Sequence, residues 1–268
     1  MTDSHGNNKE ASFETVTELP GNRAHREQID ALRTRYSWAA KFCRDRDVLE
    51  VACGAGLGLG LLAGRANSVI GGDLDPIVLR FAQEHYRGHT KINIMELDAC
   101  NTVLADSSVD VVICFEAVYY FPNMSDFLSE IRRILRPDGL FLCNSVNCEW
   151  HGFNPSPYSK KYHSVAEMQQ ELQSAGFKAK FFLSFEDSPT TLSRRLISYI
   201  RSLAVQFRLI PKTMRAKELF KRLFYGKLQP LPIELTQSIG IPRPLVVLEP
   251  DIKIKNYKVY YLKAKIQE

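Results

Sequence analysis

Apolar runs of strand length alternate with helical stretches between residues 47 and 146, and this alternation constrains the fold more than any other feature. The strand-like runs are continuous, as in strands that are buried on both faces. Strands that alternate with helices form βαβ units in a parallel sheet. The pattern predicts an α/β fold with a doubly wound, mostly parallel sheet of seven strands, at 48–52, 68–72, 92–96, 109–114, 140–143, 177–185 and 257–266.

Helical spacing and capping residues indicate where the helices lie. Ser164 and Glu167 form a capping box, and Gly176 closes that helix. Between the last two strands lie about seventy residues that the sheet does not need. We therefore divide the chain into a disordered lead-in (1–22), a core domain (23–187), a basic helical insertion (188–255) and a final strand (256–268). Helices are predicted at 23–42, 75–85, 125–135 and 164–175.

Composition excludes several classes of protein. No run of eighteen apolar residues is present, so no membrane-spanning helix is expected. The net charge of +5 is mild for a nucleic-acid-binding domain, and no nucleic-acid partner is expected. Six cysteines are scattered without CxxC spacing, which predicts no metal site and favours buried free thiols in a reducing cytoplasm.

The strongest local signal is a glycine-rich turn at residues 50–58, between a strand and a helix. Glycines let the backbone approach a ligand closely, and a helix N-terminus adds N–H groups. Asp73 follows the next strand, nineteen positions after Gly54, where a carboxylate suits the ribose hydroxyls of an adenosine ligand. Asp75 before Pro76 is the better helix cap, which leaves Asp73 for the ribose. Asp98, after the third strand, can accept from an adenine amino group.

The turn departs from the dinucleotide-binding pattern G-x-G-x-x-G. The sixth position counted from Gly54 is Leu59. Glu50 lies in the lead strand, where it would repel a pyrophosphate and suits a ligand with an ammonium group. Both observations count against an NAD(P)-binding oxidoreductase, which is the alternative function.

These residues resemble the motifs of class I S-adenosylmethionine-dependent methyltransferases, of the small-molecule and sugar-modifying type. Residues 48–58 are similar to motif I (V-L-D/E-x-G-C-G-x-G), with Ala52 where the family often has Gly. Residues 71–75 and 98–99 resemble the second and third motifs. Residues 106–112 and 135–139 resemble the segments around the fourth and fifth strands. The resemblance implies a Rossmann-like fold and S-adenosylmethionine as the cofactor.

The resemblance also assigns roles to residues. Glu50, Gly54 and Gly56 would line the methionine end, Asp73 would hold the ribose, and an upstream helix would place Tyr36 near the amino-acid end. The cofactor-binding residues implied are Tyr36, Glu50, Ala52, Gly54, Gly56, Asp73, Leu74, Asp98, Ala99 and Phe115.

The acceptor site is expected beyond the carboxyl ends of the strands. Many small-molecule relatives carry Glu-His after the fourth strand, where this chain has Tyr119 and Tyr120. No N/D-P-P-Y motif follows that strand, which argues against nucleic-acid methylation. The catalytic candidates are Tyr119, Tyr120 and His151. Residues 147–162 are rich in aromatic and turn residues and predict a binding wall that includes Tyr158.

The insertion is strongly basic. Residues 188–230 contain ten Lys and Arg but one acid, Glu218, and Arg194, Arg201 and Arg208 recur every seven residues. Such a face is compatible with a solvated lid, with a surface that binds an anionic or sugar-linked substrate, or with a surface that binds an anionic membrane. Arg194 and Arg201 are the candidate substrate-binding residues. We predict a cytoplasmic enzyme, with peripheral membrane contact as an option, that O-methylates a sugar-like or other biosynthetic small molecule. A non-catalytic S-adenosylmethionine-binding regulator is a further alternative.

Overall fold

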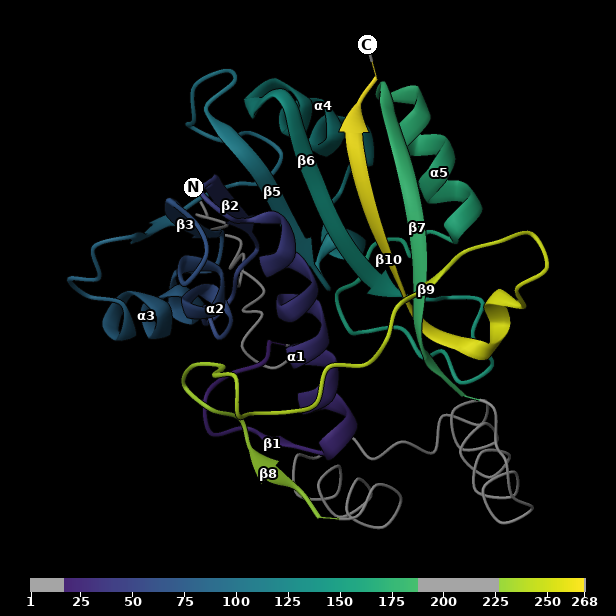
Figure 1. The fold of residues 1–268 in the computed structure, drawn as a ribbon, viewed down its shortest axis with the longest axis horizontal. Coiled ribbons are helices and arrows are strands. Elements are labelled where there is room, and N and C mark those ends of the chain that lie inside the picture. The colour runs from purple at the N-terminus through teal and green to yellow at the C-terminus, as the bar shows by residue number, and fades with distance from the viewer. Residues whose placement is uncertain (1–16, 188–226, 268) are drawn as a thin grey trace, which may run out of the picture.

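One sheet runs through the centre of the protein. The computed structural model describes residues 17–187 and 227–267 (Figure 1). Eight strands follow the order β4-β3-β2-β5-β6-β10-β7-β9. The first five of these pair in parallel, whereas β10 is antiparallel to both of its neighbours, so the doubly wound, mostly parallel sheet is confirmed. The main strands are β2 (Asp47–Val51), β3 (Ser68–Asp73), β4 (Ile92–Glu96), β5 (Val109–Phe115), β6 (Leu135–Val146), β7 (Phe177–Glu186) and β10 (Tyr257–Ile266).

The sheet has one strand more than the seven predicted. The extra strand, β9 (Val246–Val247), pairs antiparallel with Leu183 and Phe182 at the edge of β7. Two residues are too few to produce a periodic pattern, so the sequence gives no signal for this strand.

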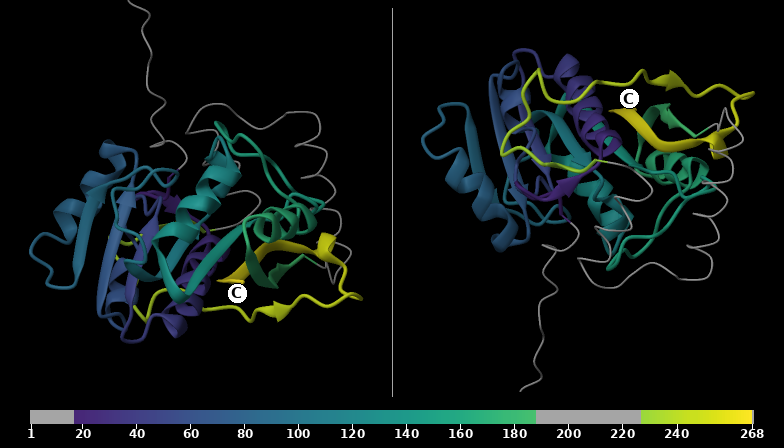
Figure 2. Two further views of the ribbon diagram at one scale, coloured as in Figure 1. Left: turned by 90° about the horizontal axis from the view of Figure 1, so that it is seen from above. Right: turned by 90° about the horizontal axis from the view of Figure 1, so that it is seen from below.

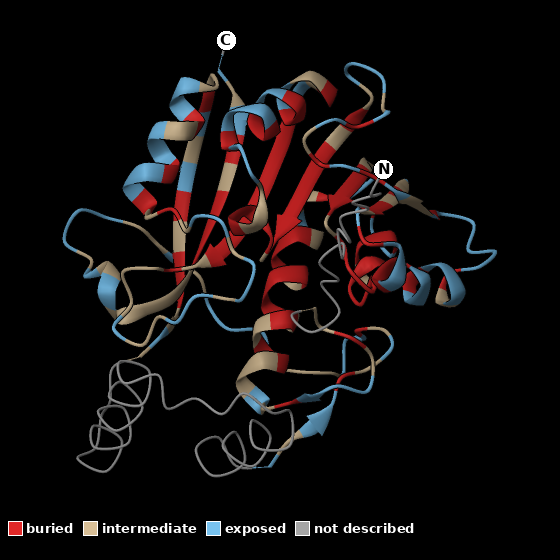
Figure 3. Cartoon of the chain, turned by 180° about the vertical axis from the view of Figure 1, so that it is seen from behind, coloured by how far each residue is buried: buried red, intermediate tan, exposed pale blue. Residues whose placement is uncertain are grey.

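Helices cover both faces of the sheet, which gives three layers (Figures 1 and 2). One apolar cluster joins α1 (Arg26–Ala39), α2 (Leu59–Ala63) and α3 (Pro76–His85) to the sheet, and a second joins α4 (Met124–Ile134) and α5 (Val165–Ser174) to it. Successive strand residues enter opposite clusters, as Val48 and Leu49 do. Buried residues line the central strands, as Figure 3 shows, because both faces are covered.

The helix ends follow the capping residues. The Ser164 side chain accepts from Glu167 N–H at 3.2 Å, and Asp75 caps α3 with Pro76 at its first position, both as predicted. α1 begins at Arg26, three residues later than predicted, because residues 23 and 24 pair with Pro230 and Gln229 in a two-stranded sheet of β1 (Arg23–Ala24) and β8 (Gln229–Pro230).

The predicted turn at 136–139 lies inside β6. Leu135 pairs with Val109, the register then shifts, and Leu140 pairs with Val111. Asp138 has φ +64° in this irregular stretch. The turn residues therefore make a bulge in one longer strand instead of ending it.

The predicted lead-in and insertion are described only in part. Residues 17–22 are packed rather than free, since Leu19 is buried and Gly21 N–H donates to Leu231 O. Residues 227–255 contain β8, β9 and the start of a 3₁₀ turn, η4 (Ile254–Asn256), with no α-helix. The predicted insertion helix with Arg194 and Arg201 lies outside the described residues. In the described part of the chain, no helix has the length and apolar character needed to cross a membrane.

Candidate active site

The predicted ligand-binding residues meet at one edge of the sheet. β2 pairs in parallel with β3 and β5, and β3 pairs with β4, so the carboxyl ends of all four strands lie side by side. The segments that leave these ends begin at Ala52, Leu74, Leu97 and Glu116. This is where ligands bind in doubly wound sheets.

The glycine-rich turn has a left-handed backbone at three positions. Ala52, Gly54 and Gly56 have φ values of +53°, +57° and +70°. A Cβ on Gly56 would lie 2.9 Å from the Ala82 Cβ, and one on Gly58 would lie 2.2 Å from the Tyr36 ring. The glycines are therefore required by backbone conformation and by the close approach of neighbours.

Internal hydrogen bonds hold the turn. Gly54 N–H donates to Asp73 Oδ2 at 2.7 Å, Gly56 N–H donates to Cys53 O, and Leu59 N–H donates to Gly56 O. The other Asp73 oxygen accepts from Asp75 N–H at 3.0 Å. These N–H groups are thus already used inside the protein, unlike the free N–H groups that cradle a pyrophosphate.

Ala52 is strained by its left-handed φ, and replacement with glycine should relieve this. We expect Ala52→Gly to stabilise the protein by about 0.5–1 kcal/mol, the strain relieved less the extra entropy of an unfolded glycine. Chemical denaturation measures the change. Ala55→Gly is the matched control in the same turn: Ala55 has no positive φ, so this variant should be less stable. A loss of stability in Ala52→Gly would contradict the account.

Glu50 is a buried carboxyl at the end of β2, with 1% of its surface exposed. Tyr36 OH donates to its Oε1 at 2.7 Å, whereas the buried Oε2 has no hydrogen-bond partner. Burial raises the pKa of Glu50 to about 8. The Tyr36 ring packs edge-on against Phe115, with centroids 5.5 Å apart. A buried carboxyl with a vacant acceptor oxygen fits a ligand that brings a positively charged donor.

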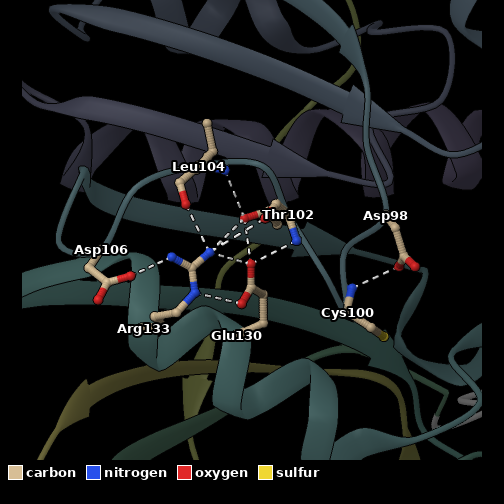
Figure 4. Close-up of polar contacts among 7 residues, drawn as sticks. All are labelled: Asp98, Cys100, Thr102, Leu104, Asp106, Glu130 and Arg133. Atoms are coloured by element: carbon tan, nitrogen blue, oxygen red, sulfur yellow. Dashed lines mark hydrogen bonds and ion pairs between the residues drawn. The ribbon is translucent and has the colours of Figure 1, made fainter.

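Asp98 and Ala99 lie on a loop that is fixed to α4 (Figure 4). Asp98 Oδ1 accepts from Cys100 N–H at 2.9 Å, and Thr102 donates twice to Glu130 Oε1. Arg133 bonds both Glu130 oxygens and Leu104 O, which holds the pKa of Glu130 down to about 2. Because the Arg133 guanidinium has this many partners, it holds the loop after β4 in a defined position against α4.

Apolar and aromatic side chains flank the same edge. Leu74, directly after Asp73, is 59% exposed. Tyr119 is buried and stacks on Tyr162, with ring centroids 4.3 Å apart, and Tyr120 OH lies 2.6 Å from Ser156 Oγ. Lys160 N–H donates to Tyr119 O at 2.7 Å. The loop after β6 is therefore packed against the residues that follow β5.

The other acceptor-site candidates lie further out on that loop. His151 is exposed, and Tyr158 is half exposed with φ +69°. The roles of His151 and Tyr158 in the acceptor site stay predictions.

Glu116 is a candidate site residue that was not predicted from the sequence. It follows β5 directly, has φ +53°, and accepts from Asn144 Nδ2 at 2.6 Å and from Tyr119 OH at 3.2 Å. Burial raises the pKa of Glu116, and burial together with Glu116 raises the pKa of Tyr119 well above 10. Tyr119 is thus a donor and not a base. The sequence signal that could have indicated Glu116 is its position as a carboxylate directly after an apolar strand.

Comparison with known proteins identifies the domain. Residues 49–143 match the methyltransferase domain family. A Mycolicibacterium smegmatis protein named "probable S-adenosylmethionine-dependent methyltransferase" is 33% identical over 151 residues, which cover 54% of this chain and 57% of that protein. A Mycobacterium tuberculosis phthiotriol/phenolphthiotriol dimycocerosates methyltransferase is 33% identical over 122 residues, 45% of this chain and 43% of that protein.

Solved structures agree on the fold. The Haemonchus contortus phosphoethanolamine N-methyltransferase 2, in complex with S-adenosyl-L-methionine, has a TM-score of 0.54 at 16% identity, over 96% of this chain and 55% of that chain. The matched regions span about half the length of the two curated relatives, 57% of the first and 43% of the second. Residues 49–143 thus belong to the methyltransferase domain family, and the chain is similar to S-adenosylmethionine-dependent methyltransferases.

Proposed function

We propose that the protein binds S-adenosylmethionine at this edge and transfers its methyl group to a small-molecule acceptor. The observation that carries the proposal is Glu50, whose buried carboxyl has a vacant oxygen beside the glycine-rich turn. A positive ligand would stabilise its ionised form. A dinucleotide would instead bring a pyrophosphate toward the buried Glu50, at a turn where the N–H groups of Gly54, Gly56 and Leu59 already donate within the protein.

The residues at the edge fit each part of this cofactor. Glu50 and Tyr36 suit the ammonium group, Asp73 the ribose hydroxyls and Asp98 with Ala99 the adenine. Leu74 offers exposed apolar surface to the nucleoside, and Phe115 is buried against Tyr36 at the methionine end. The sulfonium of the cofactor supplies the methyl group, and the residues of the protein bind, align and exclude water.

The acceptor side suits a hydroxyl compound, and we propose O-methylation of a sugar-like or other biosynthetic intermediate. Transfer to a hydroxyl needs a group that takes its proton. Tyr119 is unsuited, because its pKa is raised and its hydroxyl already donates to Glu116. Glu116 is partly exposed at the end of β5 and is the better candidate for this role.

Two measurements with the purified protein test the proposal. Mass spectrometry of the small molecules released on denaturation should detect S-adenosylmethionine or S-adenosylhomocysteine. Incubation with methyl-labelled S-adenosylmethionine and fractionated small-molecule extract should then move label into an acceptor. Bound nicotinamide dinucleotide, with no methylthio nucleoside, would contradict the proposal.

The basic insertion gives a separate prediction about an anionic partner. Arg194, Arg201 and Arg208 lie outside the described residues, and we propose that they form part of a surface for phosphate or an anionic membrane. Arginine suits phosphate through bidentate hydrogen bonds. The triple change to Gln should reduce sedimentation with phosphatidylglycerol vesicles severalfold, more at low salt than at high salt, and leave S-adenosylhomocysteine affinity intact. Equal sedimentation of variant and wild type would contradict the membrane surface.

A further inference from the structure

Arg35 is a buried cation at the amino-acid end of the proposed cofactor site. It lies on α1, with 6% of its surface exposed, directly before Tyr36, the residue that holds Glu50. Its charge acts on Glu50, Tyr36 and Glu116. The Arg35 Nε is buried without a hydrogen-bond partner. A buried guanidinium of this kind requires an anionic partner, because leaving one unpaired is strongly destabilising.

The partner that the structure gives Arg35 is Glu18, from the segment before α1. Arg35 Nη2 donates to Glu18 Oε2, and the Glu18 side chain is 37% exposed. The preceding residue, Thr17, reaches the glycine-rich turn: a Cβ on Gly54 would lie 3.0 Å from Thr17 Cγ2. Leu19 is buried and anchors the segment. Residues 17 and 18 thus lie against the first glycine of the turn and against Arg35, whose charge acts on Glu50.

We propose that the Glu18 carboxylate occupies the position at Arg35 that the α-carboxylate of the ligand takes on binding, and that a ligand with an amino-acid group displaces Glu18 from Arg35. This inference rests on the proposed function and deepens it. Glu50 binds the ammonium group of the ligand and Arg35 binds its carboxylate, so the two residues together recognise a zwitterionic amino-acid group. The exchange is one carboxylate for another, which keeps Arg35 paired throughout. Glu18 is free to turn toward water, because more than a third of its side chain is already exposed.

Internal competition of this kind lowers the affinity for every ligand that carries the carboxylate and for none that lacks it. S-adenosylhomocysteine and 5′-methylthioadenosine are a suitable pair of probes, since they share the thioether nucleoside and only the first has the amino-acid group. Glu18→Gln keeps the size of the side chain and removes its charge.

The experiment is calorimetric titration of wild type and Glu18→Gln with both probes. We expect Glu18→Gln to bind S-adenosylhomocysteine about five- to tenfold more tightly, the effect of removing one charged competitor. Its affinity for 5′-methylthioadenosine should stay within about twofold. Glu27→Gln is the matched control, because Glu27 on α1 pairs with Lys258 and should alter neither affinity.

Hydrogen exchange gives a second readout. S-adenosylhomocysteine should increase exchange at residues 17–19, whereas 5′-methylthioadenosine should not. Unchanged or weaker S-adenosylhomocysteine binding by Glu18→Gln, or an equal gain for both probes, would overturn the inference. If wild type binds neither probe, the proposed function fails instead, so the two failures are distinguishable.

Discussion

Glu50→Gln should abolish measurable S-adenosylhomocysteine binding and at the same time make the ligand-free protein more stable near pH 8. Both effects have one cause. Glu50 is buried, its Oε2 has no partner, and its pKa is raised to about 8. The ionised Glu50 carboxylate therefore favours binding of a positively charged ligand, and it destabilises the folded protein when no ligand is bound. Gln keeps the shape and the Tyr36 contact but carries no charge.

The effect on stability has a defined pH window. The folded protein holds the Glu50 proton more tightly than the unfolded chain, whose Glu pKa is about 4.3. Wild-type stability should thus fall as pH rises from about 5 to about 8, by up to about 1.4 kcal/mol per pH unit from this group. Urea unfolding at several pH values measures the slope. Glu96→Gln, at an exposed position on β4, is the control and should keep the wild-type slope.

Ligand binding should show the opposite trend. Because the ammonium group needs the carboxylate, affinity for S-adenosylhomocysteine should rise with pH up to about 8, by at most about tenfold per unit. Identical pH slopes of unfolding in wild type and Glu50→Gln would contradict the assignment of the raised pKa to this residue.

Asp73→Ala should weaken S-adenosylhomocysteine binding by about 1.5–3 kcal/mol, the scale of a charge-assisted hydrogen bond. Asp73 is the proposed ribose partner, and its two oxygens also accept from Gly54 and Asp75 N–H. The fold should survive, because Asp73 is the last residue of β3 and the pairing of β3 with β4 and β2 uses the backbone.

Asp75→Ala separates binding from stability. Asp75 caps α3 by accepting from Ile77 and Val78 N–H, so its loss should lower stability by about 1 kcal/mol and change affinity little. Calorimetry and denaturation of both variants make the comparison. An unchanged dissociation constant in Asp73→Ala would show that the ribose is held elsewhere.

Local signals predicted the parts of this site that lie within one segment. The strand ends, the glycine turn and the Asp75 cap each depend on residues a few positions apart, so periodicity and capping rules locate them. The hydrogen bond from Gly54 N–H to Asp73 was not predicted, although both residues were placed at the carboxyl ends of neighbouring parallel strands.

Contacts between distant segments could not be predicted in the same way. Glu18 meets Arg35, and Asn144 meets Glu116, only after the chain has folded. The pairing of β1 with β8 joins residues about two hundred positions apart and moves the start of α1. The two-residue strands carry no period at all. A single sequence therefore shows which residues end the strands but not which polar partners fold against them.

The most direct test of the account is calorimetric titration of the full chain at pH 8 with S-adenosylhomocysteine and with NADH. The account predicts a single site for S-adenosylhomocysteine in the micromolar range, about −8 kcal/mol, and no heat from NADH. Binding of NADH without binding of S-adenosylhomocysteine would contradict it.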